Sequence, residues 1–243
     1  MTLGKITELR HASPRRRYED ACGTAHALDL IGERWALLVM RELMLGPKRF
    51  SDIRADLPGI SANTLTQRLE GLEQAGIVTR QRLAPPASGQ VYALTEWGYQ
   101  SRPIMGALGR WATRSPAHDP AQDFSAVSLM LSFQAMNQPA LSRDLKTMMG
   151  FRLGREDYLA HLNEGAIDVV RGDAAVAAAV FAGAPSAIAA AVYGGVALGA
   201  LEAEGLLKIT GDRALAARFV TLFPLPPKAE APHASPLPHR DGR

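Results

Sequence analysis

The chain has 243 residues, of which 47% are hydrophobic and 21% charged, which suits one large or two modest globular domains. A single cysteine excludes an internal disulfide framework and a zinc site built from several cysteines. The net charge is only +3, but residues 1–115 carry +5 and residues 116–243 carry −2, so a polyanionic partner would favour the N-terminal half.

Three stretches have the composition of unfolded or connecting segments. Residues 1–20 are polar and rich in arginine, which predicts a flexible arm; they lack the apolar core of a secretory signal, and we therefore expect a cytoplasmic protein. Residues 115–123 contain two prolines among small polar residues and predict a linker. Residues 223–243 are rich in proline and alanine and predict a disordered tail. Two folded domains are thus expected, over residues 21–114 and 124–222.

The first domain opens with helical patterns. Four apolar residues recur at the spacing of one helix face: Leu28, Ile31, Trp35 and Leu38. They predict a single amphipathic helix over residues 24–45, followed by a short helix over residues 50–57. Ser61 is a typical N-cap for a third helix, and Gly76 is its expected stop.

The third helix has an unusual polar face. Leu65, Leu69 and Leu72 form its apolar stripe, yet its first two turns hold no acidic residue, although helix N-termini favour Asp and Glu. The opposite face carries Asn63, Thr64, Gln67 and Arg68. Asn, Gln and Arg are the side chains whose donors and acceptors match base edges in the major groove. This face predicts a DNA-recognition helix; the alternative is an ordinary solvated helix face.

A basic hairpin and a last helix complete the domain. Strand-like residues 77–83 and 90–95 flank a turn over residues 84–89, and Arg80 and Arg82 stand where they could reach DNA phosphates. Thr95 can cap a final helix with a kink at Pro103. That helix has an apolar stripe of Ile104, Leu108 and Trp111. This order of elements is typical of a winged helix-turn-helix.

Five segments of this domain carry a family resemblance: residues 22–43, 46–53, 57–61, 65–78 and 92–98. In order and without gaps, they resemble the HxlR-type winged-helix regulators. The resemblance implies a homodimer that binds double-stranded operator DNA, with the first and last helices of the domain paired across a two-fold axis. It also implies DNA contacts by the family's recognition positions, which here are Ser61, Asn63, Thr64, Gln67 and Arg68.

The second domain mixes strands and helices. Residues 127–133 alternate apolar and small polar side chains, which predicts a half-buried strand. Further strands are expected over residues 147–154, 158–165, 166–173 and 205–212, and helices over residues 174–181 and 186–201. Asp173 and Asp212 each follow a glycine and precede a helical pattern, so we expect them to cap helices; a phosphate site is the alternative.

This block resembles the sterol-carrier-protein-like α+β fold, mainly over residues 207–219. The resemblance implies a curved sheet with helices that enclose an apolar tunnel. The whole chain is therefore expected to be α+β, with an N-terminal winged helix-turn-helix followed by a sterol-carrier-like domain. Adaptable Met and aromatic side chains make an effector-binding candidate set of Met130, Met148, Met149, Phe151 and Tyr158. The alternative is that these residues fill a core that supports a dimer.

Residues 174–201 form an uncharged run of 28 residues, longer than the roughly 20 that span a bilayer. The run is mostly Ala and Gly, is broken by Pro185, and has acidic flanks at Asp173 and Glu202. We therefore expect buried Ala-rich helices and no membrane partner.

The sequence shows no pattern typical of an enzyme, and we expect no cofactor and no metal site. Cys22 lies where many HxlR-type proteins have an N-terminal cysteine, through which some of them sense oxidants. His26, one helical turn on, could favour its thiolate. A small buried residue is the alternative interpretation of Cys22.

The preferred hypothesis is a dimeric DNA-binding repressor that responds to a small apolar effector in the C-terminal domain. The first alternative is a carrier of acyl-type ligands that uses the winged helix as a protein-interaction module. The second is a redox-responsive regulator acting through Cys22, with a purely structural C-terminal domain.

Overall fold

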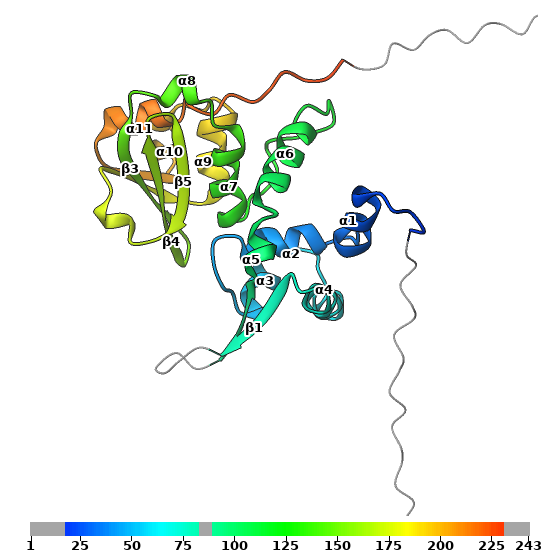
Figure 1. The fold of residues 1–243 in the computed structure, drawn as a ribbon. Coiled ribbons are helices and arrows are strands. Elements are labelled where there is room, and N and C mark those ends of the chain that lie inside the picture. The colour runs from blue at the N-terminus through cyan, green and yellow to red at the C-terminus, as the bar shows by residue number, and fades with distance from the viewer. Residues whose placement is uncertain (1–17, 83–88, 231–243) are drawn as a thin grey trace, which may run out of the picture.

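The structure is a computed structural model that describes residues 18–82 and 89–230 (Figure 1). The expected arm over residues 1–20 lies mostly outside the described residues, as do most of the hairpin turn and residues 231–243 of the expected tail. Within the described ranges, every helix is too short or too polar to span a bilayer.

The N-terminal domain is a helical unit with one two-stranded antiparallel sheet. Its elements are α1 (Gly23–Ile31), α2 (Ala36–Leu43), α3 (Phe50–Asp56), α4 (Ala62–Gln74), β1 (Val78–Arg82), β2 (Gln90–Leu94), α5 (Glu96–Tyr99) and α6 (Arg102–Ala112). Thr95 accepts a hydrogen bond from the Gly98 amide, which confirms it as a helix cap. The winged helix-turn-helix order is therefore present.

The single helix expected over residues 24–45 is wrong. The chain leaves the helix after Ile31 and re-enters it at Ala36, and Trp35 takes a left-handed conformation with φ of 78°. The Arg68 side chain of α4 holds this break: its Nε donates to the Arg34 carbonyl at 2.9 Å, and its guanidinium pairs with Glu33 at 3.1 Å. Of the predicted apolar stripe, Ile31 and Trp35 pack against the domain core, whereas Leu28 and Leu38 are exposed.

The kink expected at Pro103 is also wrong. The helix after Thr95 ends at Tyr99, and Pro103 lies in the first turn of a separate helix, α6. A proline in the first turn loses no helical hydrogen bond, because the N–H that it lacks would have no partner there. The proline therefore marks a helix start.

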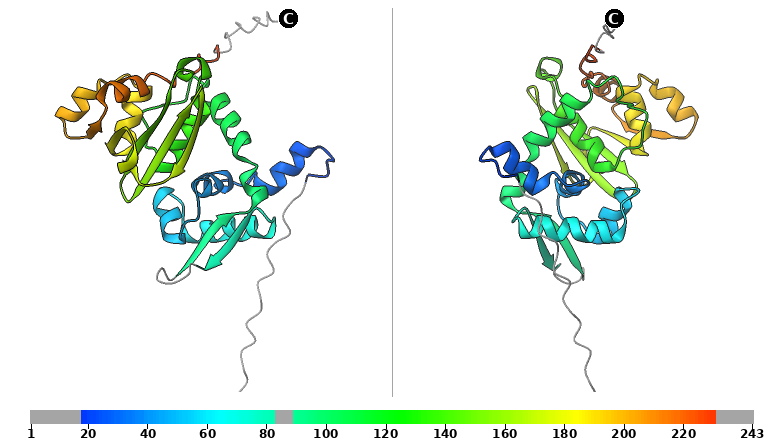
Figure 2. Two further views of the ribbon diagram at one scale, coloured as in Figure 1. Left: turned by 60° about the vertical axis from the view of Figure 1, so that its left-hand side comes forward. Right: turned by 90° about the vertical axis from the view of Figure 1, so that its right-hand side faces the viewer.

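The C-terminal domain is a five-stranded sheet with helices packed on it (Figure 2). Its elements are α7 (Ala126–Met136), α8 (Pro139–Ser142), β3 (Lys146–Leu153), β4 (Glu156–Asn163), β5 (Ala166–Arg171), a 3₁₀ turn (Ala174–Val176), β6 (Ala179–Gly183), α9 (Pro185–Tyr193), α10 (Leu198–Ala203), β7 (Leu207–Gly211) and α11 (Arg213–Phe219). The strand order is β5-β4-β3-β6-β7, with β3 and β6 parallel and all other neighbours antiparallel.

Two predicted elements of this domain have the wrong type. Residues 127–133 belong to helix α7, which Ser125 caps by accepting from the Ser128 amide. Residues 174–181 form a short turn and strand β6, where a helix was expected. Residues 127–133 are buried or half-buried throughout, so their apolar spacing carries no clear period, and residues 174–181 are mostly alanine, which marks no face. The expected helix over residues 186–201 is divided into α9 and α10 around Gly194-Gly195.

The aspartate caps are confirmed. Asp173 accepts from the Ala175 amide, and Asp212 accepts from the Leu215 amide at the start of α11.

An aromatic cluster forms the centre of the C-terminal domain. Phe133 of α7 lies 5.4 Å from Phe151, 5.2 Å from Phe219 and 4.9 Å from Phe223 between ring centres. Phe223 is 1% exposed, so the folded domain continues past residue 222, where we expected it to end. Beyond it, the Lys228 ammonium donates to the carbonyls of Ser115 and His118 at 3.1 and 3.0 Å, which ties the chain after the domain to the connecting segment.

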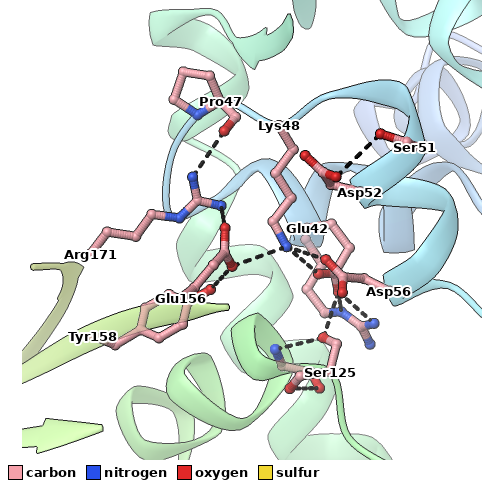
Figure 3. A network of polar contacts seen from close by, with 12 residues as sticks. Glu42, Pro47, Lys48, Ser51, Asp52, Asp56, Ser125, Glu156, Tyr158 and Arg171 are labelled. Atoms are coloured by element: carbon pink, nitrogen blue, oxygen red, sulfur yellow. Dashed lines mark hydrogen bonds and ion pairs between the residues drawn. The ribbon is translucent and has the colours of Figure 1, made fainter. Parts of the chain in front are cut away.

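A buried ion network joins the two domains (Figure 3). The Lys48 ammonium, on a residue that is 3% exposed, contacts Glu42 at 3.2 Å and Asp56 in its own domain, and Glu156 of β4 at 3.7 Å. Glu42 is fully buried and accepts from the Ser125 hydroxyl at 2.7 Å, directly before α7.

The network is balanced in charge. Arg171 of β5 pairs with Glu156 at 2.9 Å and donates to the Pro47 carbonyl at 2.9 Å, and Arg41 pairs with Glu42 at 2.8 Å. Three carboxylates therefore meet three cations. Burial raises the pKa of the Asp56 carboxyl, and its hydrogen bond from Lys48 opposes that rise.

We predict that Lys48→Met lowers the free energy of unfolding by about 3–5 kcal/mol, because it leaves the buried Glu42 carboxylate without this cation and removes the link to the partly exposed Glu156 of the other domain. Urea denaturation followed by circular dichroism measures this change. The matched control is Arg152→Met, which removes an exposed ion pair to Asp157 of 3.6 Å and should cost less than about 1 kcal/mol. Equal losses in the two variants would contradict a special role for the network.

Candidate nucleic-acid interface

The orientation of α4 follows from its cap and its apolar stripe. The Ser61 hydroxyl accepts from the Thr64 amide at 3.1 Å and lies 2.8 Å from the Thr64 hydroxyl, which confirms Ser61 as the N-cap. Leu65, Leu69 and Leu72 are buried in the domain core. With that face fixed inward, the helix must present its polar residues outward.

Two of the predicted recognition residues lie on that outward face. Asn63 and Gln67 are exposed and stand one helical turn apart. The first turn of α4 contains no acidic residue, so no carboxylate there would repel a phosphate. Ser61 and Thr64 also lie at this end, where their hydroxyls bond each other in the cap. An exposed amide pair at an acid-free helix end can read the edges of bases.

Arg68 is placed differently. Its side chain is only 16% exposed and is used by the contacts with Glu33 and Arg34 that hold the α1–α2 break. In this conformation Arg68 positions the loop beside α4 and does not extend from the surface.

The two predicted arginines of the wing also differ from each other. Arg80 pairs with Glu73 of α4 at 2.9 Å, and its guanidinium lies 5.6 Å from the centre of the Tyr92 ring. Arg82 is exposed at the end of β1. Arg80 thus fixes the hairpin against α4, and Arg82 is the better placed of the two for a phosphate.

Two further exposed arginines of this domain lie outside the predicted set. Arg54 lies on α3, and Arg49 lies directly before it. A Cβ added to Gly89, at the base of the hairpin, would stand 3.2 Å from the Arg49 guanidinium, so Arg49 lies beside the wing. A count of basic residues over all elements before the wing could have found both.

An apolar surface stands on the last helix of the domain. Ile104 is 59% and Trp111 72% exposed, and Leu108 between them is exposed as well; their spacing places all three on one face of α6. On α1, Leu28 is exposed in the same way. Contiguous exposed apolar side chains on a helix are typical of a protein-protein interface.

Cys22 is exposed, so its interpretation as a small buried residue is wrong. It occupies the N-cap position of α1. Hydrogen bonds from the backbone amides of Thr24 and Ala25 lower the pKa of its thiol, because they stabilise the thiolate at a helix start. The expected contribution of His26 is not among the causes of this shift.

The five predicted effector-binding residues lie in and beside the core of the C-terminal domain. Met130, Met149, Phe151 and Tyr158 are fully buried in the packed core of the C-terminal domain, and Met148 is half-buried on β3. A pocket of about 770 Å³ lies elsewhere, between α6 and α7, and none of the five lines it. In the described part of the chain, no group of three His, Cys, Asp or Glu could hold a metal ion.

Comparisons with known proteins find relatives of the N-terminal domain. The family model of the HxlR-like helix-turn-helix matches residues 30–119. The uncharacterized HTH-type transcriptional regulator YvaP of Bacillus subtilis is 38% identical over 87 residues, which are 36% of this chain and 81% of YvaP. The transcriptional regulator YodB of the same organism is 41% identical over 86 residues, which are 35% of this chain and 77% of YodB.

Two solved structures are similar in sequence to part of this chain. The reduced form of YodB is 37% identical and covers 40% of this chain and 98% of its own, with a TM-score of 0.37 over the whole chain. The redox regulator HypR in its oxidized form is 31% identical and covers 40% of this chain and all of its own, with a TM-score of 0.36. YvaP and YodB are named as transcriptional regulators and not as enzymes. The share of YvaP and YodB that is matched shows that this chain belongs to the HxlR-like family of helix-turn-helix transcriptional regulators.

Proposed function

We propose that the protein is a homodimeric operator-binding repressor that responds to a small apolar effector held by its C-terminal half. The observation that carries the DNA-binding part is the acid-free N-terminal end of α4, where Asn63 and Gln67 are exposed on a helix fixed by its buried leucines. The net charge of +5 on residues 1–115 suits a polyanionic partner.

The dimer is supported by the exposed apolar face of α6, together with Leu28 on α1. A monomer would leave Ile104, Leu108 and Trp111 in water, whereas pairing across a two-fold axis would bury them. Two copies of α4 would then face successive half-sites of an inverted repeat.

The C-terminal assignment to a sterol-carrier-like fold is supported by its five-stranded sheet with packed helices. Its tightly filled aromatic core gives no support to a tunnel inside the sheet. We therefore assign the effector to the pocket between α6 and α7. A carrier that uses the winged helix only to bind proteins is less well supported, because it would have no need of an acid-free N-terminal end on α4.

We predict that Ile104→Glu separates the dimer, because a carboxylate in an apolar interface costs several kcal/mol and should raise the dimer dissociation constant at least about 100-fold. Sedimentation velocity over a range of concentrations measures this. Val176→Glu is the matched control: Val176 is 61% exposed, close to the 59% of Ile104, but lies in the C-terminal domain. A variant at Ile104 that stays dimeric would place the interface elsewhere.

We predict different DNA phenotypes for the helix and the wing. Gln67→Ala should lose about 1–3 kcal/mol of discrimination at particular base pairs, because it removes a base-edge contact. Arg82→Ala should weaken operator and random DNA alike and reduce the salt slope by about one, because it removes a phosphate contact. Anisotropy titrations at several salt concentrations, on an operator selected from genomic fragments, measure both effects. Equal loss on operator and random DNA in both variants would contradict this division of roles.

A second candidate function is a redox response through Cys22, which its exposure and the lowered pKa of its thiol favour. Solved structures of YodB include reduced, quinone-bound and diamide-treated forms.

We predict that a quinone lowers operator binding by the wild type and has no effect on Cys22→Ser, since Cys22 is the only thiol of the chain. Intact-mass spectrometry of the treated proteins should show one adduct on the wild type and none on the variant. An adduct on Cys22 that leaves operator binding unchanged would make the thiol reactive but not regulatory.

A further inference from the structure

The pocket between α6 and α7 has the size and lining of a small-molecule site. Its volume of about 770 Å³ lies within the range of roughly 300–1,000 Å³ that is typical of ligand pockets. Met105, Leu131 and the stacked rings of Phe124 and Tyr193, 6.3 Å apart, contribute to its apolar walls. The half-buried Tyr193 hydroxyl bonds the Ser132 hydroxyl at 2.6 Å, and burial raises the pKa of this tyrosine.

The charges around the pocket have one sign. Three arginines line it, and none of its lining residues in the described chain is Asp or Glu. Arg41 is paired with Glu42, and Arg102 lies 3.6 Å from Asp168. Arg110 has no ion pair with any described residue; it donates one hydrogen bond to the Ala135 carbonyl, and a guanidinium has five N–H donors. Arg110 is thus the cation available to an anionic ligand.

Two buried polar atoms of the lining residues lack a partner. His118 Nδ1 and Gln134 Oε1 are buried without a hydrogen bond to any described residue. Leaving such atoms unsatisfied costs about 1–3 kcal/mol each, and because both atoms are buried, a ligand in the pocket would reach them only after a side-chain movement.

We propose that this pocket binds an amphipathic carboxylate, an apolar or aromatic acid whose body fills the apolar walls and whose carboxylate pairs with Arg110. The inference rests on the proposed regulation by an effector and specifies the site and the chemistry of that effector. Because α6 carries both Arg110 and the exposed face of Ile104, Leu108 and Trp111, the ligand would act on the helix proposed to join the two subunits.

The glycines of α6 allow a test that blocks the pocket without a clash. A Cβ added to Gly109, which lines the pocket, would meet no atom within 4 Å, and the same holds for Gly199 on α10, which does not line it. Gly109→Leu should therefore fill the pocket, and Gly199→Leu is its matched control. Sedimentation velocity checks that both variants keep the oligomeric state of the wild type.

The probes are naphthalene-1-acetate and its neutral amide, naphthalene-1-acetamide, titrated into the full chain by calorimetry. We expect the wild type to bind the acid about tenfold more tightly than the amide, as one charge-assisted contact predicts. Arg110→Met should remove this preference and leave the amide within about twofold of its wild-type affinity. Gly109→Leu should abolish binding of both probes, and Gly199→Leu should change neither.

Other results would overturn the proposal. Absence of acid binding by the wild type, equal affinity for acid and amide, or unchanged acid binding by Gly109→Leu would each contradict it. Operator titrations distinguish failure of the proposed ligand site from failure of the proposed DNA-binding function. A shift of roughly 5–150-fold in operator affinity on adding the acid supports regulation through this site. Acid binding as expected without any operator binding would overturn the DNA function and leave the carboxylate site standing.

Discussion

The arrangement of the two domains depends on the buried ammonium of Lys48. A buried cation is tolerated only when it is paired, and its partners come from both sides of the domain boundary: Glu42 and Asp56 in the winged helix, Glu156 in the sheet. The Ser125 hydroxyl on Glu42 ties the start of α7 to the same point. With α7 fixed there, its side chains stand opposite α6, and the pocket between these helices is defined.

The sequence predicted the winged helix more accurately than the sheet domain because its signals are local. The caps at Ser61 and Thr95 act within three residues, and each was found where expected. The type of residues 174–181 is decided at long range, by pairing of β6 with β3 and β7, and an alanine-rich run does not show it. The helix over residues 127–133 was missed because burial on most sides removes the period that separates helix from strand.

The residues of the candidate interface also fall into those that local signals predict and those that long-range contacts place. Asn63 and Gln67 follow from the phase of α4, which the leucine stripe fixes from within the helix. The placement of Arg68 cannot be predicted from the phase of α4, because its acceptor, the Arg34 carbonyl, lies 34 residues away in sequence. No sequence pattern predicts the pocket, whose lining runs from Arg41 to Leu225 and exists only once α2, α6, α7, the linker and the tail have come together.

The energies of the contacts around α6 decide which of them an effector could change. Coupling between a ligand and DNA is typically about 1–3 kcal/mol, and the ligand can supply no more than its difference in affinity for the two conformations. The partly exposed Arg102–Asp168 contact, which ties the start of α6 to β5, is worth less than about 1 kcal/mol and can be exchanged within that range. Breaking the Lys48 network costs about 3–5 kcal/mol. The coupling energy of an effector is therefore too small to exchange these contacts. An effector in the pocket would therefore move α6, with the proposed dimer face on it, while the C-terminal domain stays anchored to α2 and α3.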